Sequence, residues 1–191
     1  MSILLANEVE QEAIIAAAKL IMAAVTTAPK TRGVSSIQSA LIHGEDKNRL
    51  AEAMENHGPA KAAVPEIFQR DAQNVRNSAA VVLIGVKGTM PKKPEKPLNC
   101  GACGYSSCSE FIRARKGKQG EDFVGPLCAF QSIDLGIALG VAVKVAAELN
   151  IDNRLMYTIG AGAMAMKILD ADIIVGLPLS VAAKNIFFDR G

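Results

Sequence analysis

The 191-residue sequence contains no tryptophan, and aromatic residues make up only 4% of it. Half of its residues are nevertheless hydrophobic, so there is enough apolar material for a sizeable core. Small residues (Ala, Gly and Val) together with Ile supply most of this material. The composition therefore favours close packing of backbones over clusters of large rings.

The sequence also lacks a marked excess of charge of either sign. It has 21 Lys and Arg against 19 Asp and Glu, for a formal net charge of +2. Proteins that bind nucleic acid usually carry a strongly basic patch. From the overall balance we expect no nucleic-acid partner.

No targeting or membrane segment is evident. Residues 1–8 lack the basic start and the long apolar stretch of a secretory signal. The most apolar stretch, residues 127–149, is interrupted by Asp134, Lys144 and Glu148. Each of these charges costs roughly 2.5–3.5 kcal/mol in lipid. We therefore expect a buried helix in a soluble, cytoplasmic protein with no membrane partner.

Helices and strands are expected to alternate along the chain. The patterns predict helices over residues 8–25, 45–56, 65–77, 109–116, 126–150 and 161–169, and strands over residues 36–43, 79–86, 154–158 and 172–179. The continuous apolar run at 79–86 is typical of a strand buried on both faces. Residues 87–99 are rich in Lys and Pro, which predicts an exposed connection.

These elements predict one domain spanning residues 1–191. Two αβαβ halves, residues 1–86 and 126–191, are expected to share a sheet, because neither half is expected to close a core alone. A cysteine-rich segment, residues 98–130, would be inserted between them.

All four cysteines lie within 29 residues, as C-x2-C-x4-C followed by a distant fourth: Cys100, Cys103, Cys108 and Cys128. Soft thiolates suit iron–sulfur clusters or zinc. Three closely spaced cysteines can surround one side of a cubane cluster while the distant one closes the other. Glycines follow the first two cysteines and allow the loop to turn at positive φ. The spacing favours a 4Fe–4S site.

Two alternatives remain open. A structural zinc site usually has two C-x2-C pairs, and this chain has one. Unmetallated cysteines are the other alternative, although disulfides are not expected without a secretion signal.

The string Cys-Gly-x-Cys-Gly-x-x-x-Cys with a distant Cys resembles the 4Fe–4S motif of carbon monoxide dehydrogenase/acetyl-CoA synthase subunits and of electron-transport-complex ferredoxin subunits. The resemblance implies that Cys100, Cys103, Cys108 and Cys128 are the ligands. With the Gly125–Phe130 stretch and the following helix, the whole chain resembles the uncharacterised ferredoxin-domain family of anaerobic prokaryotes.

The flanks resemble the nitroreductase fold, through Thr27-Ala28-Pro29 and through the order Ile159-Gly160, helix, strand. This implies an α+β sandwich with a mixed, largely antiparallel central sheet flanked by helices, built as a homodimer with FMN at the interface. The Arg-Arg-Ser-type phosphate site of that family is missing from residues 3–9, and Lys30 and Arg32 are the residues that could meet a phosphate.

Three functional hypotheses follow. The first is a ferredoxin-like electron-transfer protein with an unknown redox partner; the second is an FMN-dependent oxidoreductase fed by the cluster; the third is a binding module with structural zinc. Whether the protein is an enzyme stays open, and no catalytic residue is predicted. His43 and His57 show no partner at a catalytic spacing, and Gly160 and Gly162 are expected to form a tight turn into a short helix.

Overall fold

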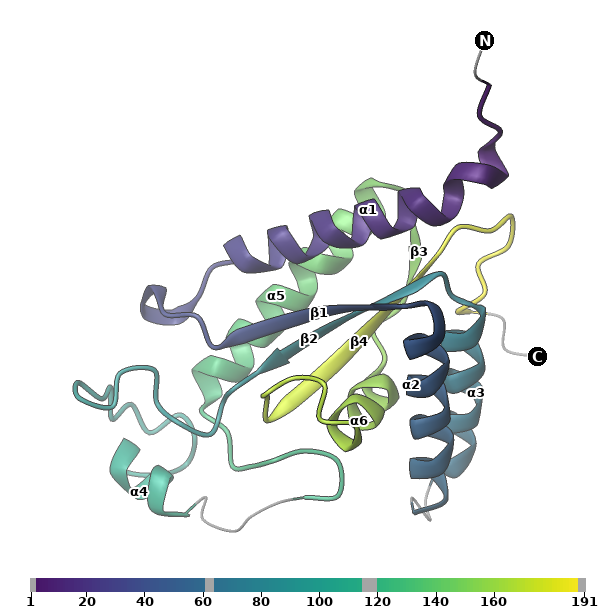
Figure 1. The fold of residues 1–191 in the computed structure, drawn as a ribbon. Helices are drawn as coiled ribbons and strands as arrows, with labels where there is room; N and C mark the ends of the chain where they lie inside the picture. Colours follow the sequence, from purple (N-terminus) through teal and green to yellow (C-terminus); the bar gives the residue numbers. More distant parts are fainter. Residues whose placement is uncertain (1–2, 61–63, 115–119, 189–191) are drawn as a thin grey trace.

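A four-stranded antiparallel sheet runs through the middle of the computed structural model, which describes residues 3–60, 64–114 and 120–188 (Figure 1). Its strands are β1 (Ile37–His43), β2 (Ala80–Val86), β3 (Asp152–Asn153) and β4 (Ile173–Ser180). They lie in the order β1-β2-β4-β3, so strands from both ends of the chain share one sheet. The expected α+β sandwich and largely antiparallel sheet are confirmed, and every pair among the described strands is antiparallel.

Strand β2 lies inside the sheet, and all seven of its residues are buried. Because side chains alternate along a strand, Val82 and Ile84 enter one hydrophobic core while Val81 and Leu83 enter the other. This two-sided burial explains the continuous apolar run in the sequence.

One face of the sheet is covered by α1 (Ala6–Thr27) and α5 (Ala129–Glu148), which pack side by side (Figure 1). Isoleucines of α1 and alanines of α5 fill this core. Among the described helices, α5 is the one whose length and composition would allow it to cross a membrane. Here one side of α5 packs against α1 and the sheet, and its Asp134 is buried.

The opposite face is covered by α2 (Gly44–His57), α3 (Pro65–Asn77) and α6 (Tyr157–Ala165). Leu50, Met54 and Phe68 form the centre of this second core together with Ile159. Two short 3₁₀ turns, η1 (Thr31–Gly33) and η2 (Gly58–Ala60), follow α1 and α2.

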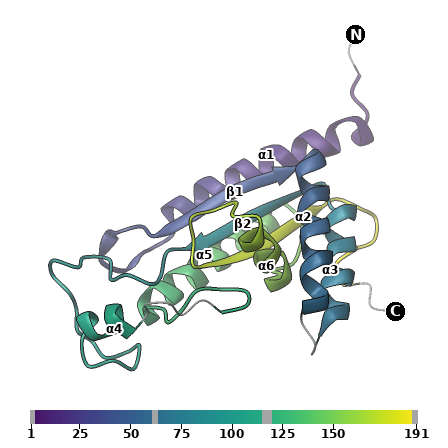
Figure 2. The same ribbon diagram turned by 60° about the horizontal axis from the view of Figure 1, so that its bottom comes forward.

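The connection from β2 to α5 projects from one end of the sheet and contains α4 (Cys108–Ala114) (Figure 2). The predicted helix over residues 109–116 is confirmed to Ala114; residues 115–119 lie outside the described part. The expected exposure of residues 87–99 holds only for its second half, since Gly88 and Thr89 are buried. Thr89 donates from its N–H and its hydroxyl to Asp172 Oδ2, at 2.8 and 2.7 Å, which ties this stretch to the sheet.

The predicted strand at residues 154–158 is wrong. Strand β3 ends at Asn153, and α6 already begins at Tyr157. Gly160 lies within this helix against β4, where an added Cβ would stand 1.7 Å from the carbonyl oxygen of Ile174. The glycine therefore allows a helix to pass directly over a strand, and the expected turn before the helix is replaced by this contact.

Candidate metal centre

Cys128 lies at the end of the connection between β2 and α5, directly before the first residue of α5. Its N–H donates to the carbonyl of Gly88 at 2.9 Å, and its own carbonyl accepts from the N–H groups of Gln131 and Ser132 at 3.0 and 3.1 Å. It is the residue that precedes the first turn of a 20-residue helix. The partial positive charge at the start of the helix therefore lies beside Cys128.

The other three cysteines lie on a loop closed by Asn99. The side-chain oxygen of Asn99 accepts a hydrogen bond from the N–H of Cys108 at 2.9 Å, which brings the end of the loop back to its beginning. Gly101 and Gly104 have φ values of +74° and +87°, as the sequence predicted, and the N–H of Gly104 donates to the Gly101 carbonyl at 2.9 Å. The two glycines thus provide the left-handed backbone that this turn requires.

Three of the four predicted ligands meet at one pocket. Cys100, Cys108 and Cys128 line one small pocket, whereas Cys103 is absent from its lining and is partly exposed on the loop. Nothing stands within 4 Å of the position where a side chain would begin at Gly104, so the loop carrying Cys103 has open space beside it. Within the described ranges, no three His, Cys, Asp or Glu side chains are arranged to hold a metal ion.

The thiol chemistry and the shared pocket fit a thiolate-bound metal group, but the thiols are not gathered around one point here, so the cysteine loop would have to rearrange around such a group. All four cysteines are free thiols in this structure. Four soft thiolates match both an iron–sulfur cluster and zinc.

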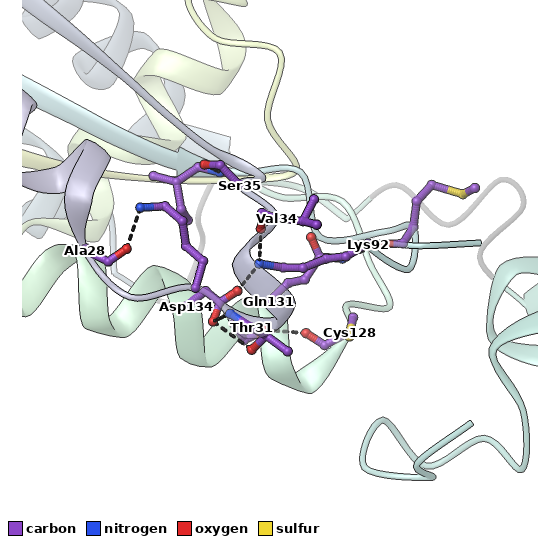
Figure 3. Close-up of polar contacts among 12 residues, drawn as sticks. Ala28, Thr31, Val34, Ser35, Lys92, Cys128, Gln131 and Asp134 are labelled. Atoms are coloured by element: carbon purple, nitrogen blue, oxygen red, sulfur yellow. Dashed lines mark hydrogen bonds and ion pairs between the residues drawn. The ribbon is translucent and has the colours of Figure 1, made fainter. Parts of the chain in front are cut away.

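A buried ion pair lies beside this pocket, whose lining includes Lys92 (Figure 3). Lys92 donates from Nζ to Asp134 Oδ2 and to the carbonyl of Val34, the latter at 2.6 Å. The Lys92 and Asp134 side chains are only 4% and 1% exposed. Thr31 donates to Asp134 Oδ1 from its N–H and its hydroxyl, at 2.9 Å each. Both oxygens of the buried carboxylate therefore accept hydrogen bonds, and its negative charge is balanced by the Lys92 ammonium.

These contacts determine the protonation of Asp134. Burial by itself would raise the pKa of this carboxyl, but the hydrogen bonds from Lys92 and Thr31 outweigh it and hold the pKa below its ordinary value. Gln131, also on α5 and buried, donates to the carbonyl of Met90. The η1 turn, the start of the connection and α5 are thus joined at the base of the cysteine pocket.

The two residues considered for a phosphate are engaged with the backbone. Lys30 donates from Nζ to the carbonyls of Val25, Thr26 and Ala28 at 3.0, 2.8 and 2.7 Å, at the C-terminal end of α1. Burial lowers the pKa of Lys30, and the nearby ammonium of Lys92 lowers it further. Arg32 donates from Nη1 to the carbonyl of Lys96 at 2.6 Å and lines the cysteine pocket.

His57 has a carboxylate partner that the sequence spacing did not reveal. Its Nε2 lies 2.6 Å from Asp122 Oδ1, and the Tyr157 hydroxyl donates to Asp122 Oδ2 at 2.5 Å. Phe68 packs against the rings of both His57 and Tyr157. The sequence showed no partner for His57 at a catalytic spacing, and it could not reveal Asp122, because 65 residues separate the two.

Comparison with known proteins places the chain in a family. It is 47% identical, over 174 residues, to a protein of Archaeoglobus fulgidus described as "Uncharacterized protein"; the match covers 91% of this chain and 90% of that one. Residues 124–190 match the family model described as "Uncharacterized protein containing a ferredoxin domain". The chain belongs to this ferredoxin-domain family.

A second model matches the cysteine loop of this ferredoxin-domain protein. It covers residues 97–117 and is described as "Putative Fe-S cluster". This segment contains Cys100, Cys103 and Cys108, while Cys128 lies within the ferredoxin-domain match. The sequence-based recognition of the family is confirmed.

Solved structures show that the ferredoxin-domain protein has a nitroreductase-like fold. The FMN-dependent nitroreductase of Mycobacterium smegmatis in complex with NADPH matches with a TM-score of 0.57 at 9% identity, covering 88% of this chain and 78% of that one. The NADPH:FMN oxidoreductase of Vibrio harveyi complexed with NAD+ matches with a TM-score of 0.52 at 12% identity. That match covers 89% of this chain and 60% of the Vibrio protein. At these identities the likeness establishes the fold alone.

Proposed function

We propose that this ferredoxin-domain protein binds one 4Fe–4S cluster through Cys100, Cys103, Cys108 and Cys128 and transfers single electrons. The observation that carries the proposal is the convergence of three of these thiols on one pocket at the N-terminus of α5. The match of the cysteine loop to an iron–sulfur model supports it. When bound, such a cluster accepts and donates one electron at a time.

The residues around the pocket would adjust the stability of the bound group. Cys128 is fixed by its backbone bonds to Gly88 and α5, and Asn99 keeps Cys108 near the start of the loop. The α5 dipole and the guanidinium of Arg32 at the pocket wall offset negative charge there. Positive surroundings stabilise the more negative, reduced form of a cluster and so raise its reduction potential.

The test is a spectroelectrochemical titration of protein purified and reconstituted without oxygen. We expect a reversible one-electron transition within the range of about −700 to +450 mV known for such clusters. A protein that holds a full cluster but shows no reversible transition there would contradict the electron-transfer role. As a comparison, Lys144→Ala, which removes an exposed side chain near the far end of α5 from Cys128, should titrate like the wild type.

A flavin-dependent oxidoreductase is the second candidate, favoured by the nitroreductase-like fold and by FMN in the descriptions of the two structures named above. The engagement of Lys30 and Arg32 with backbone carbonyls weakens it, because a phosphate site needs donors free to converge. A yellow chromophore released by heat, or tight binding in an FMN titration, would support this candidate; no FMN binding would remove it.

A structural zinc is the third candidate, since four thiolates also suit that metal. In that case the metal would only hold the loop in place. One zinc per chain without acid-labile sulfide distinguishes it from the cluster.

We also infer a homodimer and a reducing, cytoplasmic location. Ile133 and Ile137 are 54% and 38% exposed on the outer face of α5. Gly136 and Gly140 lie on the same helix, with nothing within 4 Å of either. A second copy packed there would cover this face. Light scattering of the wild type and of Ile137→Lys tests the homodimer: we expect a dimer for the wild type and a monomer for the variant.

The cytoplasmic location follows from the proposed ligands, because thiolate ligands require reduced cysteines, which a reducing compartment maintains.

A further inference from the structure

The near-neutral total charge conceals a strongly basic segment. Residues 87–119 contain eight Lys and Arg but only two acidic residues, so they carry six net positive charges. The rest of the chain carries four net negative charges. The same basic segment contains three of the four cysteines.

Several of the described basic residues lie at the cysteine pocket. Arg32 and Lys93 line it, and Lys96 is exposed beside it with its carbonyl held by Arg32. Some charges of the segment are compensated from elsewhere: Lys92 pairs with Asp134, and Lys87 pairs with Asp170 at 2.5 Å. A 4Fe–4S cluster with four thiolates would bring a charge of about −2. The segment keeps a net positive charge after the two ion pairs and the cluster charge are subtracted.

An exposed apolar residue lies within this basic surface. Leu98 is 51% exposed, lines the pocket and stands two residues before Cys100. Interfaces commonly combine an apolar centre with a polar rim. We call Arg32, Lys93, Lys96 and Leu98 the pocket rim.

We propose that the pocket rim docks an acidic electron-carrier protein of the ferredoxin or flavodoxin type, an inference that rests on the proposed function. A partner must approach the cluster where its pocket opens, and the charge there is opposite to that of an acidic carrier. Long-range attraction of this kind raises association rates by 10–10³-fold and fades with salt. Electron-transfer encounters are small and weak, typically below about 1,200 Å², which four rim residues suit.

The electron balance is simple. The reduced carrier loses one electron, the oxidised cluster gains it, and no bond is made or broken. Nucleic acid is the less suitable partner, because single-strand binding uses exposed aromatic platforms. The cysteine loop offers Tyr105, whose ring packs on Phe111 with centroids 5.9 Å apart, and the pocket lining adds one half-buried ring, Phe130.

The experiment compares the double variant Lys93→Glu/Lys96→Glu with the matched control Lys19→Glu/Lys167→Glu, whose lysines are exposed elsewhere on the molecule. A purified acidic ferredoxin, reduced and freed of reductant, is mixed with cluster-loaded protein in a stopped-flow instrument. We expect the second-order rate at low salt to fall at least tenfold in the rim variant and to stay within about twofold in the control. The difference should shrink as salt is raised. A rim variant that is reduced as fast as the wild type would overturn the proposal.

A second readout separates this inference from the cluster itself. Binding of the same ferredoxin to metal-free protein is measured by calorimetry at low salt, so it does not depend on cluster assembly. Binding that is lost in the rim variant and kept in the control supports docking even if no cluster is found. Absence of ferredoxin binding by the wild type, or binding instead to single-stranded RNA or to vesicles containing phosphatidylserine, would overturn it.

Discussion

Lys92 and Asp134 form a hydrogen-bonded ion pair in which both side chains are almost completely buried. Lys92 lies on the connection that leads to the cysteine loop, and Asp134 lies on the helix that begins after Cys128. The pair therefore links the two chain segments that carry the cysteines, beside the pocket that Lys92 lines (Figure 3).

Removing the acid from this pair should destabilise the fold. We expect Asp134→Ala to lower the free energy of unfolding by about 3–5 kcal/mol, because it leaves the Lys92 ammonium buried without its partner. Urea denaturation of metal-free protein measures this. Glu148→Ala is the control: its pair with Lys144 is exposed, and its loss should cost about 0.3–0.5 kcal/mol. Equal losses of unfolding free energy in the two variants would show that the buried pair stabilises the fold no more than an exposed pair does.

The same carboxylate predicts loss of stability in acid. The pKa of Asp134 is lower in the folded protein than its ordinary value of 3.8, so folding favours the ionised form. Its contribution is complete above the ordinary value and disappears as pH falls through the lowered folded-state pKa. Urea midpoints of metal-free protein from about pH 5 to pH 2 should fall less steeply in Asp134→Asn than in the wild type. Parallel curves would contradict this assignment.

Two glycines in helices should respond oppositely to alanine. Gly160→Ala places a Cβ 1.7 Å from the Ile174 carbonyl oxygen, which forces α6 away from β4 and should greatly reduce soluble yield and melting temperature. Gly140→Ala meets nothing within 4 Å and should raise stability by about 0.5–1 kcal/mol, because alanine favours the helix. Thermal unfolding of both variants measures these changes in melting temperature. A Gly160→Ala protein as stable as the wild type would refute the close contact between α6 and β4.

Asp122 should hold the segment that leads to Cys128. Asp122→Ala removes the acceptor of the Tyr157 hydroxyl and the partner of His57, and should cost about 1–3 kcal/mol. Hydrogen exchange should increase in residues 120–124. Asp46→Ala, which breaks an exposed pair with Arg49, is the control and should leave exchange in that segment unchanged. Unaltered protection in Asp122→Ala would mean that other contacts position the segment.

Much of the fold can be read from local patterns. The continuous apolar run of β2 predicts a central strand, and Pro65 at the start of α3 coincides with the observed boundary. The error at residues 154–158 has a different origin, because Gly160 meets the backbone of Ile174 only when the chain has folded. No local pattern contains that contact.

The candidate site was predictable to a similar degree. Four cysteines close together in sequence indicate a shared site, and three of them line one pocket. The Lys92–Asp134 pair joins residues 42 apart, so spacing could not reveal it. The local excess of Lys and Arg in residues 87–119 was present in the sequence but concealed by the balanced total.

The most direct measurement is the metal and sulfide content of wild-type protein purified without oxygen, alongside Cys128→Ser. The account predicts about four iron atoms and four acid-labile sulfides per chain in the wild type, and the loss of both in the variant. One zinc per chain without sulfide, or an undiminished cluster in Cys128→Ser, would contradict it.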